Sequence, residues 1–141
     1  MAGSHVISGR VVEAGLAELH ELMDRVRAEH PAVDPSELLL LETALIEIAG
    51  NAVEHGTPPG GLRYRFVLEL GDDGLHGTFT DDGDPVALPP DTGAPPDPLS
   101  ESGRGLALAR AALTELRYER QGAANVWVLF RRDDARARSP R

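Results

Sequence analysis

Hydrophobic residues recur at helical spacing over two long segments of the chain. In residues 34–59, one apolar stripe advances in steps of three and four through Leu38, Leu41, Leu45, Ile48 and Ala52. Further apolar residues widen this stripe: Leu39, Leu40, Ala44 and Ile46. We therefore expect a largely buried helix. Residues 13–30 combine an apolar stripe with a charged face, which predicts a surface helix that ends at Pro31.

Both ends of the 34–59 segment carry helix-terminating signals. Asp34 is the expected N-cap, Pro35 suits the first helical position, and Glu37 would complete a capping box. Gly56 suits the left-handed position after the last turn, and Pro58–Pro59 prevents the helix from continuing.

Alternation of apolar and polar residues predicts the strands. Residues 62–70 and 75–80 alternate on either side of a turn at 71–74 and form one predicted hairpin. A short strand is expected at 5–12, and a second hairpin from 117–121 and 125–131. Between the hairpins lie a proline-rich loop over 86–102 and a helix that begins at Leu106.

This order of elements predicts an α+β fold. We expect a two-layer α/β sandwich, with helices on one face of a mixed, mostly antiparallel sheet. Residues 1–132 are expected to form one domain, and the polar, arginine-rich tail 133–141 to be disordered.

Composition excludes several classes of protein. The 141 residues carry a formal net charge of −9, which disfavours nucleic acid and anionic membranes as partners. Cysteine is absent, which excludes thiolate catalysis and cysteine-bound zinc, and the histidines lack metal-ligand spacing in the sequence. All 14 basic residues are arginine, so a P-loop lysine is excluded as well. With no membrane-spanning run, we expect a cytoplasmic protein.

Three polar residues follow one edge of the 34–59 helix. Glu47, Asn51 and His55 are spaced four residues apart and therefore share one side of the helix. They could form a polar seam that hydrogen-bonds to neighbouring backbone. Alternatively, Glu47 could act as a base and the neutral oxygen of Asn51 as a ligand for a hard cation such as Mg²⁺. The helix by itself leaves both interpretations open.

Two further motifs lie at the ends of predicted elements. Asp81-Asp82-Gly83 follows a strand, where an aspartate can accept from an exocyclic amine and a glycine leaves room for a base. Gly103-Arg104-Gly105-Leu106 precedes a predicted helix, whose free amides can bind phosphate oxygens. Each motif by itself also fits an ordinary turn or loop end.

Taken together, these motifs resemble those of the Bergerat-fold (GHKL) ATPases, which include gyrase B, the heat-shock chaperone, histidine kinases and the mismatch-repair ATPase. Residues 47–56 resemble the N box, 81–83 the first glycine box and 103–106 the second. The short chain and the E-x-x-x-N-A-x-x-H-G form most resemble the anti-sigma factor serine kinases of bacterial partner-switching systems. The resemblance implies the Bergerat type of α/β sandwich with bound ATP and Mg²⁺.

The resemblance also implies roles for individual residues. Asn51 would coordinate Mg²⁺ at the ATP phosphates, Glu47 would be the general base for a serine hydroxyl, and His55 would belong to the same nucleotide-binding box. Asp81 would read the adenine amino group, with Gly83 beneath the base.

The second glycine box would contact the triphosphate. Gly103, Arg104 and Gly105, followed by Leu106, would border it beneath a lid formed by residues 86–102. The implied activity is transfer of the ATP γ-phosphate to a serine of an anti-anti-sigma protein, in competition with sigma-factor binding. Relatives often form homodimers.

The sequence departs from the family pattern at two places. Pro85 stands where a second glycine is usual, and Ala123 and Ala124 follow Gly122 where a threonine often lies near the nucleotide. These departures keep a second hypothesis open, in which the chain is a non-catalytic binding module of the same fold. A third, a Mg²⁺-dependent hydrolase that uses Glu47 and His55, lacks a further carboxylate on that helix face.

Overall fold

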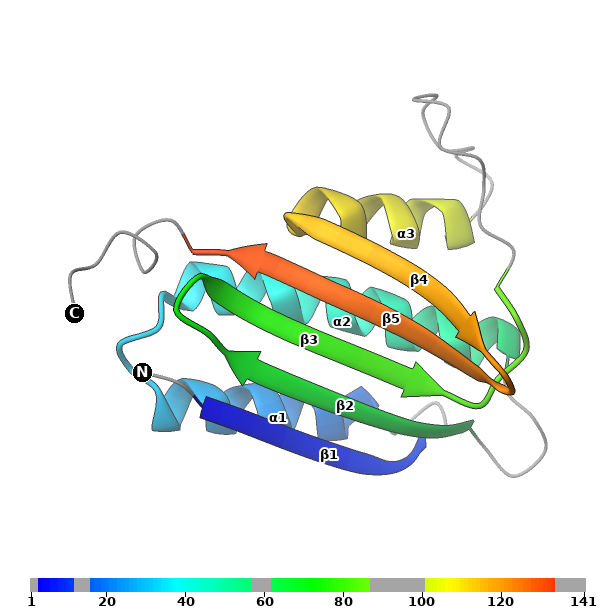
Figure 1. The fold of residues 1–141 in the computed structure, drawn as a ribbon, viewed down its shortest axis with the longest axis horizontal. Helices are drawn as coiled ribbons and strands as arrows, with labels where there is room; N and C mark the ends of the chain where they lie inside the picture. Colours follow the sequence, from blue (N-terminus) through cyan, green and yellow to red (C-terminus); the bar gives the residue numbers. More distant parts are fainter. Residues whose placement is uncertain (1–2, 12–15, 57–61, 87–100, 134–141) are drawn as a thin grey trace.

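The fold is built around one antiparallel sheet (Figure 1). The computed structural model describes residues 3–11, 16–56, 62–86 and 101–133, with the backbone alone for 10–11, 55–56 and 101–104. Its strands are β1 (Gly3–Val11), β2 (Leu62–Leu70), β3 (Gly74–Asp81), β4 (Glu115–Gln121) and β5 (Ala124–Arg132). They are ordered β1-β2-β3-β5-β4, and each pairing among these described strands is antiparallel. The parallel component of the expected mixed sheet is therefore not found among them.

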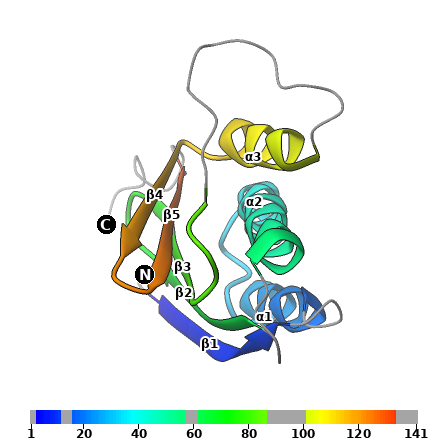
Figure 2. The same ribbon diagram turned by 90° about the vertical axis from the view of Figure 1, so that its right-hand side faces the viewer.

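The described helices lie together on one face of this sheet, as Figure 2 shows. They are α1 (Leu16–Glu29), α2 (Pro35–Gly56) and α3 (Glu101–Ala112), with α2 between the other two. This arrangement confirms the predicted two-layer α+β sandwich. None of the described helices is both long and apolar enough to cross a membrane.

The core fills the space between the helices and the inner face of the sheet. On β2 the burial alternates as the sequence predicts, with Arg63 and Arg65 on the outer side. Phe66 and Phe79 are fully buried and are the largest such side chains. Burial of each side chain of this kind contributes roughly 1.5–3 kcal/mol. The largest buried helix residues that meet them are Leu19, Leu22, Met23, Leu38, Leu41, Leu45 and Ile48.

The start of α2 follows only part of the predicted capping pattern. Asp34 is the N-cap, because its Oδ1 accepts a hydrogen bond from the Ser36 amide at 2.8 Å. Glu37 does not complete the expected reciprocal box; its carboxylate pairs with Arg131 of β5, whose Nε lies 2.5 Å from Oε2. A tertiary ion pair between α2 and β5 thus replaces a local contact.

Two details of the helices differ from the sequence prediction. The helix expected to begin at Leu106 begins at Glu101, so Gly103 and Gly105 lie inside α3 and not in a loop before it. Packing of Gly105, which is buried, against α2 outweighs the low helix propensity of glycine. Leu39, expected to widen the buried stripe of α2, is 57% exposed.

Several predictions fall on residues outside the described ranges. Most of the expected lid is among them, since only Val86 and the α3 residues at its other end are described. The same holds for the prolines after α2 and for residues 134–141 of the expected tail. Asp133, at the start of that tail, is buried, and its amide donates to the Asp73 carbonyl at 3.1 Å.

Gly74 and Gly122 provide a matched test of this geometry, because both have positive φ (149° and 59°). A Cβ at Gly74 would lie 2.2 Å from the Arg131 carbonyl oxygen, whereas a Cβ at Gly122 would meet nothing within 4 Å. Gly122→Ala should therefore cost only the left-handed strain, about 1–2 kcal/mol. Gly74→Ala should cost about 3 kcal/mol or more, because overpacking adds to the strain. Urea denaturation measures both changes, and equal costs would contradict the tight pairing of β3 with β5.

Candidate functional site

Glu47 and Asn51 lie one turn apart on α2, and both are half-buried. The Glu47 carboxylate lies against α3. A Cβ built on Gly105 would be only 2.9 Å from Glu47 Oε2. The absence of a side chain at Gly105 therefore creates the space that this carboxylate occupies.

The second glycine motif lies within α3, and its two glycines, Gly103 and Gly105, therefore have different roles. Gly103 is the third residue of α3 and Gly105 the fifth. The first N–H groups of a helix have no partner within the helix, so the backbone at Gly103 is suited to bind an anion. Gly105 lies further into the helix, and its observed contribution is the space beside Glu47.

Asp81, at the end of β3, is a buried carboxylate, 2% exposed. Its Oδ1 accepts hydrogen bonds from the Gly83 amide and from Asn125 Nδ2, each at 2.9 Å. Its Oδ2 is buried and has no hydrogen-bond partner within the described part of the chain. Burial raises the pKa of Asp81 above its ordinary value, although these hydrogen bonds and the charge of Arg120 act in the opposite direction. An oxygen of this kind is suited to accept from a ligand N–H group.

The neighbouring carboxylate of Asp82 has a structural role at the surface. It is exposed, and its Oδ1 accepts from the Arg63 amide at 2.9 Å, while the Asp82 amide donates to the Arg63 carbonyl at 3.2 Å. These two bonds attach the end of β3 to β2. The Asp81-Asp82 pair thus divides into a buried residue beside the site and an anchor on the surface.

Asn125 of β5 holds the turn that follows Asp81. Besides Asp81, its side-chain amide donates to the Asp84 carbonyl at 2.9 Å. Its Oδ1 accepts from the Tyr118 hydroxyl at 2.5 Å and from Arg120 Nη1 at 3.1 Å. Arg120 Nη1 also donates to the Gly83 carbonyl at 2.7 Å. Side chains from two strands, Arg120 of β4 and Asn125 of β5, therefore hold the turn at residues 81–84.

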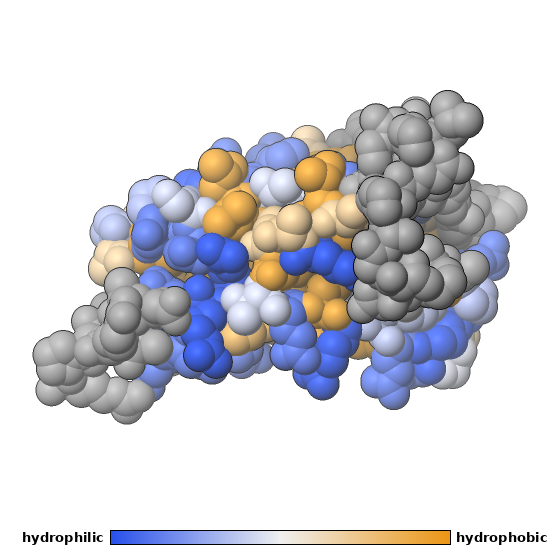
Figure 3. Space-filling view, turned by 90° about the horizontal axis from the view of Figure 1, so that it is seen from above, coloured by the Kyte–Doolittle hydropathy of each residue, from blue (hydrophilic) through white to orange (hydrophobic). Residues whose placement is uncertain are grey.

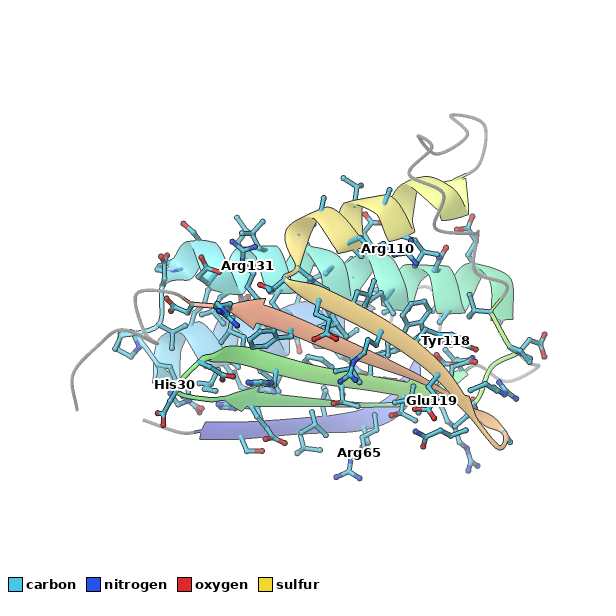
Figure 4. All side chains as sticks on the ribbon, turned by 45° about the horizontal axis from the view of Figure 1, so that its top comes forward. His30, Arg65, Arg110, Tyr118, Glu119 and Arg131 are labelled. Atoms are coloured by element: carbon cyan, nitrogen blue, oxygen red, sulfur yellow. The ribbon has the colours of Figure 1, made fainter. Side chains whose placement is uncertain are left out.

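The same network reaches the first residue of the proline-rich segment. The Tyr118 hydroxyl accepts from the Val86 amide at 3.0 Å while it donates to Asn125. Figure 4 labels Tyr118 on β4, at the end of the sheet away from His30. The described start of the segment 86–102 is thus attached to the hairpin β4-β5.

Sequence reasoning did not identify Asn125, Tyr118 or Arg120. One signal was present: Asn125 alternates in phase with Trp127 and Leu129, which are buried, so a polar side chain was directed toward the core. Its partner could not be read from the sequence, because the register that places Asp81 opposite Asn125 arises from the pairing of β3 with β5.

The remaining predicted site residues separate into three groups. Gly83 is buried, with its amide and its carbonyl both engaged in the network above. Leu106 was expected to border the nucleotide, but its side chain is 3% exposed and belongs to the hydrophobic core. The side chains of His55 and Arg104 lie outside the described part of the structure, so their predicted contacts stay predictions.

The described donors and acceptors suit a nucleotide with a hard cation. The unpartnered oxygen of Asp81 fits an exocyclic amine, and the amide oxygen of Asn51 is a ligand type that Mg²⁺ accepts. Glu47, beside Asn51, can accept a proton from a hydroxyl group.

The environment of Asp81 predicts how stability depends on pH. Since its pKa is raised in the folded state, the ionised carboxylate opposes folding at neutral pH. Asp81→Asn should therefore raise the melting temperature at pH 7, by about 2–4 °C for each kcal/mol gained. The gain should vanish below about pH 4, where the wild-type carboxyl is protonated in both states. Thermal melts from pH 3 to pH 8 measure it.

Asp82→Asn is the matched control, because Asp82 is exposed and an asparagine oxygen can still accept from the Arg63 amide. The charge of Asp82 adds to the raised pKa of Asp81, but less than burial does, so Asp82→Asn should raise the melting temperature at pH 7 by far less than Asp81→Asn. A wild-type protein that is more stable than Asp81→Asn at pH 7 would contradict the assigned cost of burial.

Comparison with known proteins adds an independent observation. The family model described as histidine kinase-like ATPase domain matches residues 12–131. A solved structure of the RsbU and RsbW domains of Rv1364c from Mycobacterium tuberculosis superposes with a TM-score of 0.67 at 20% sequence identity. The match covers 92% of this chain and 32% of that one, so the chain spans about a third of the length of the chain in that structure. Curated proteins include no significant match. With most of its length matched by the family model, the chain belongs to the histidine kinase-like ATPase domain family.

Proposed function

We propose that this protein is an ATP-dependent serine kinase of the anti-sigma type, with Glu47 as the general base and Asn51 as the Mg²⁺ ligand. The observation that carries the proposal is the position of these two side chains. They lie one turn apart on α2, and the carboxylate lies against the glycine-bearing helix α3. A module that only binds nucleotide has no need for a base beside the metal ligand.

Asp81 would bind the adenine base at one end of the proposed site. Its buried, unpartnered oxygen would accept from the adenine amino group, and Asn125 holds the other oxygen in place. After Gly122, the hairpin β4-β5 lacks the threonine that often follows this glycine in the family. The hairpin still supports the proposed site, because the side-chain amide of Asn125 donates a hydrogen bond to Asp81.

Residues of α2 and α3 would bind the phosphates at the other end of the site. Asn51 would hold Mg²⁺ at the phosphates, and the backbone at Gly103 and Arg104, in the first turn of α3, would contact the phosphate oxygens. Mg²⁺, when bound, neutralises charge that develops on the transferred phosphoryl group.

Glu47 would remove the proton from the serine hydroxyl as its oxygen attacks the γ-phosphorus. The bond between the γ-phosphorus and the β–γ bridging oxygen breaks, and ADP leaves with the electron pair. Most of the rate enhancement would come from positioning and charge neutralisation, because this transfer needs little covalent participation by the protein.

The proposed partners are an anti-anti-sigma protein that carries the serine and a sigma factor, in the cytoplasm; a homodimer is compatible with the proposal. The helical layer offers exposed apolar side chains for such contacts, with Leu108 of α3 at 52% and Leu39 of α2 at 57%. Figure 3, which looks onto the α3 side, shows hydrophobic residues among hydrophilic ones.

Two substitutions on α2 separate catalysis from binding. Glu47→Gln should retain ATP affinity but lower phosphoryl transfer by about 10²-fold or more, because the base is lost while the size of the side chain is kept. Asn51→Ala should weaken ATP binding only when Mg²⁺ is present. Calorimetric titration with and without Mg²⁺ measures binding, and transfer from γ-labelled ATP to the serine of an anti-anti-sigma protein measures activity.

Three outcomes would contradict the proposal. Unchanged phosphoryl transfer in Glu47→Gln would exclude Glu47 as the general base. An unchanged Mg²⁺-dependent titration in Asn51→Ala would remove that residue from the metal site. No binding by the wild-type chain at millimolar ATP would favour the contact-only module of the same fold.

The contact between Gly105 and Glu47 gives a second test. A methyl group at position 105 would lie 2.9 Å from Glu47 Oε2 and displace the carboxylate. Gly105→Ala should therefore lower transfer by about 10²-fold, the effect of a misplacement near 1 Å, with smaller loss of ATP affinity. Gly50→Ala is the control, since a Cβ there meets nothing within 4 Å. Similar transfer rates in the two variants would show that Gly105 does not position the base.

A further inference from the structure

Two histidines and a glutamate meet at the end of the molecule opposite Asn125. His5 comes from β1, Glu29 is the last residue of α1, and His30 follows it directly. One ligand atom from each of the three lies within 4.8 Å of the others. Figure 4 shows His30 at one end of the fold and Tyr118 at the other. The sequence had shown histidines without metal-ligand spacing, and the fold brings these two together.

The two imidazole rings face each other through their Nε2 atoms, which are 2.9 Å apart. The rings are nearly perpendicular, with centroids 5.0 Å apart. The third group lies beside the same ring, since Glu29 Oε2 is 3.7 Å from His5 Nδ1, the ring nitrogen that does not face His30. A turn of the His5 ring or of the exposed Glu29 side chain would bring the carboxylate to the ion. Two zinc–nitrogen bonds of about 2.0–2.1 Å at a tetrahedral angle span about 3.3 Å, so the two Nε2 atoms need to separate by only a few tenths of an ångström to share an ion.

Gly3 makes room for this arrangement. It lies on the same face of β1 as His5, two residues away. A Cβ at Gly3 would lie 2.9 Å from His30 Cε1 and 3.2 Å from His30 Nε2. The His30 ring therefore occupies space that any other residue at position 3 would fill.

The surroundings suit a metal that is exchanged with solvent. The His5 side chain is 15% exposed and that of Glu29 is 59% exposed, so the imidazole is partly shielded while the carboxylate faces water. Two imidazoles with one carboxylate form a donor set typical of zinc with an open fourth position, whereas Mg²⁺ prefers oxygen ligands.

We propose that His5, Glu29 and His30 form a binding site for Zn²⁺ that joins the edge strand β1 to the end of α1. The site is separate from the proposed nucleotide site and does not depend on its function. Without metal, one imidazole donates to the other, and the contact between them is an ordinary hydrogen bond.

The test is a calorimetric titration with Zn²⁺ of the full chain, without a polyhistidine tag and freed of metal by a chelator, in millimolar Mg²⁺. We expect saturable binding of one ion per chain. His5→Ala and His30→Ala should each weaken it by about 10²-fold, and Glu29→Gln by about tenfold. Cobalt substitution provides a second readout, because a site of this kind gives a visible absorption spectrum that the histidine variants should lose.

The chain contains two matched controls. His20 lies 2.7 Å from Glu42 and His76 2.7 Å from Asp73, so each pairs with a carboxylate, and neither has a second imidazole beside it among the described side chains. His20→Ala and His76→Ala should bind Zn²⁺ with wild-type affinity.

Three results would overturn the proposal: no saturable binding by the wild-type chain, unchanged affinity in both His5→Ala and His30→Ala, or equal losses in the control variants. Circular dichroism establishes whether each variant is folded. Should the partly buried histidine variants unfold, the exposed Glu29→Gln decides, and unchanged affinity there would then reject the site.

Discussion

The hydrogen bond between Asn125 and Asp81 is the contact on which the candidate site depends. Burying a carboxylate costs free energy, yet one Asp81 oxygen is held by hydrogen bonds while the other has no partner within the described part of the chain. The holding residue also binds the backbone of the following turn and, through Tyr118, the start of the segment after it. One side chain on β5 therefore orients the acceptor and fixes the backbone around it.

The second constraint is the close approach of α3 to α2. Gly105 has no side chain at the point where the Glu47 carboxylate lies, so the two helices can pack with a charged group between them. This contact gives the glycine of the second motif a role beyond backbone flexibility. It also explains why a helix can begin before the glycines, since packing against α2 supports a segment whose composition favours a loop.

Much of the architecture followed from local patterns. The two hairpins, the long central helix and the surface helix are all present, because alternation and 3.6-residue spacing record which side of an element faces the core. Local patterns failed where a tertiary contact competed with a local one. Glu37 pairs with Arg131 instead of closing a capping box. At Leu39 the pattern failed for another reason, because this side chain faces away from the sheet and is exposed although it belongs to an apolar run.

The sequence by itself determined the class of fold, the motifs and the placement of Glu47 and Asn51 on one helix, because these depend on residues close together in the chain. Only the tertiary structure decided which distant residues meet. The pairing of Asp81 with Asn125, the contact of Glu47 with Gly105 and the meeting of His5 with His30 each join separate elements. Strand register and helix packing set these contacts, and both result from burial summed over the whole core.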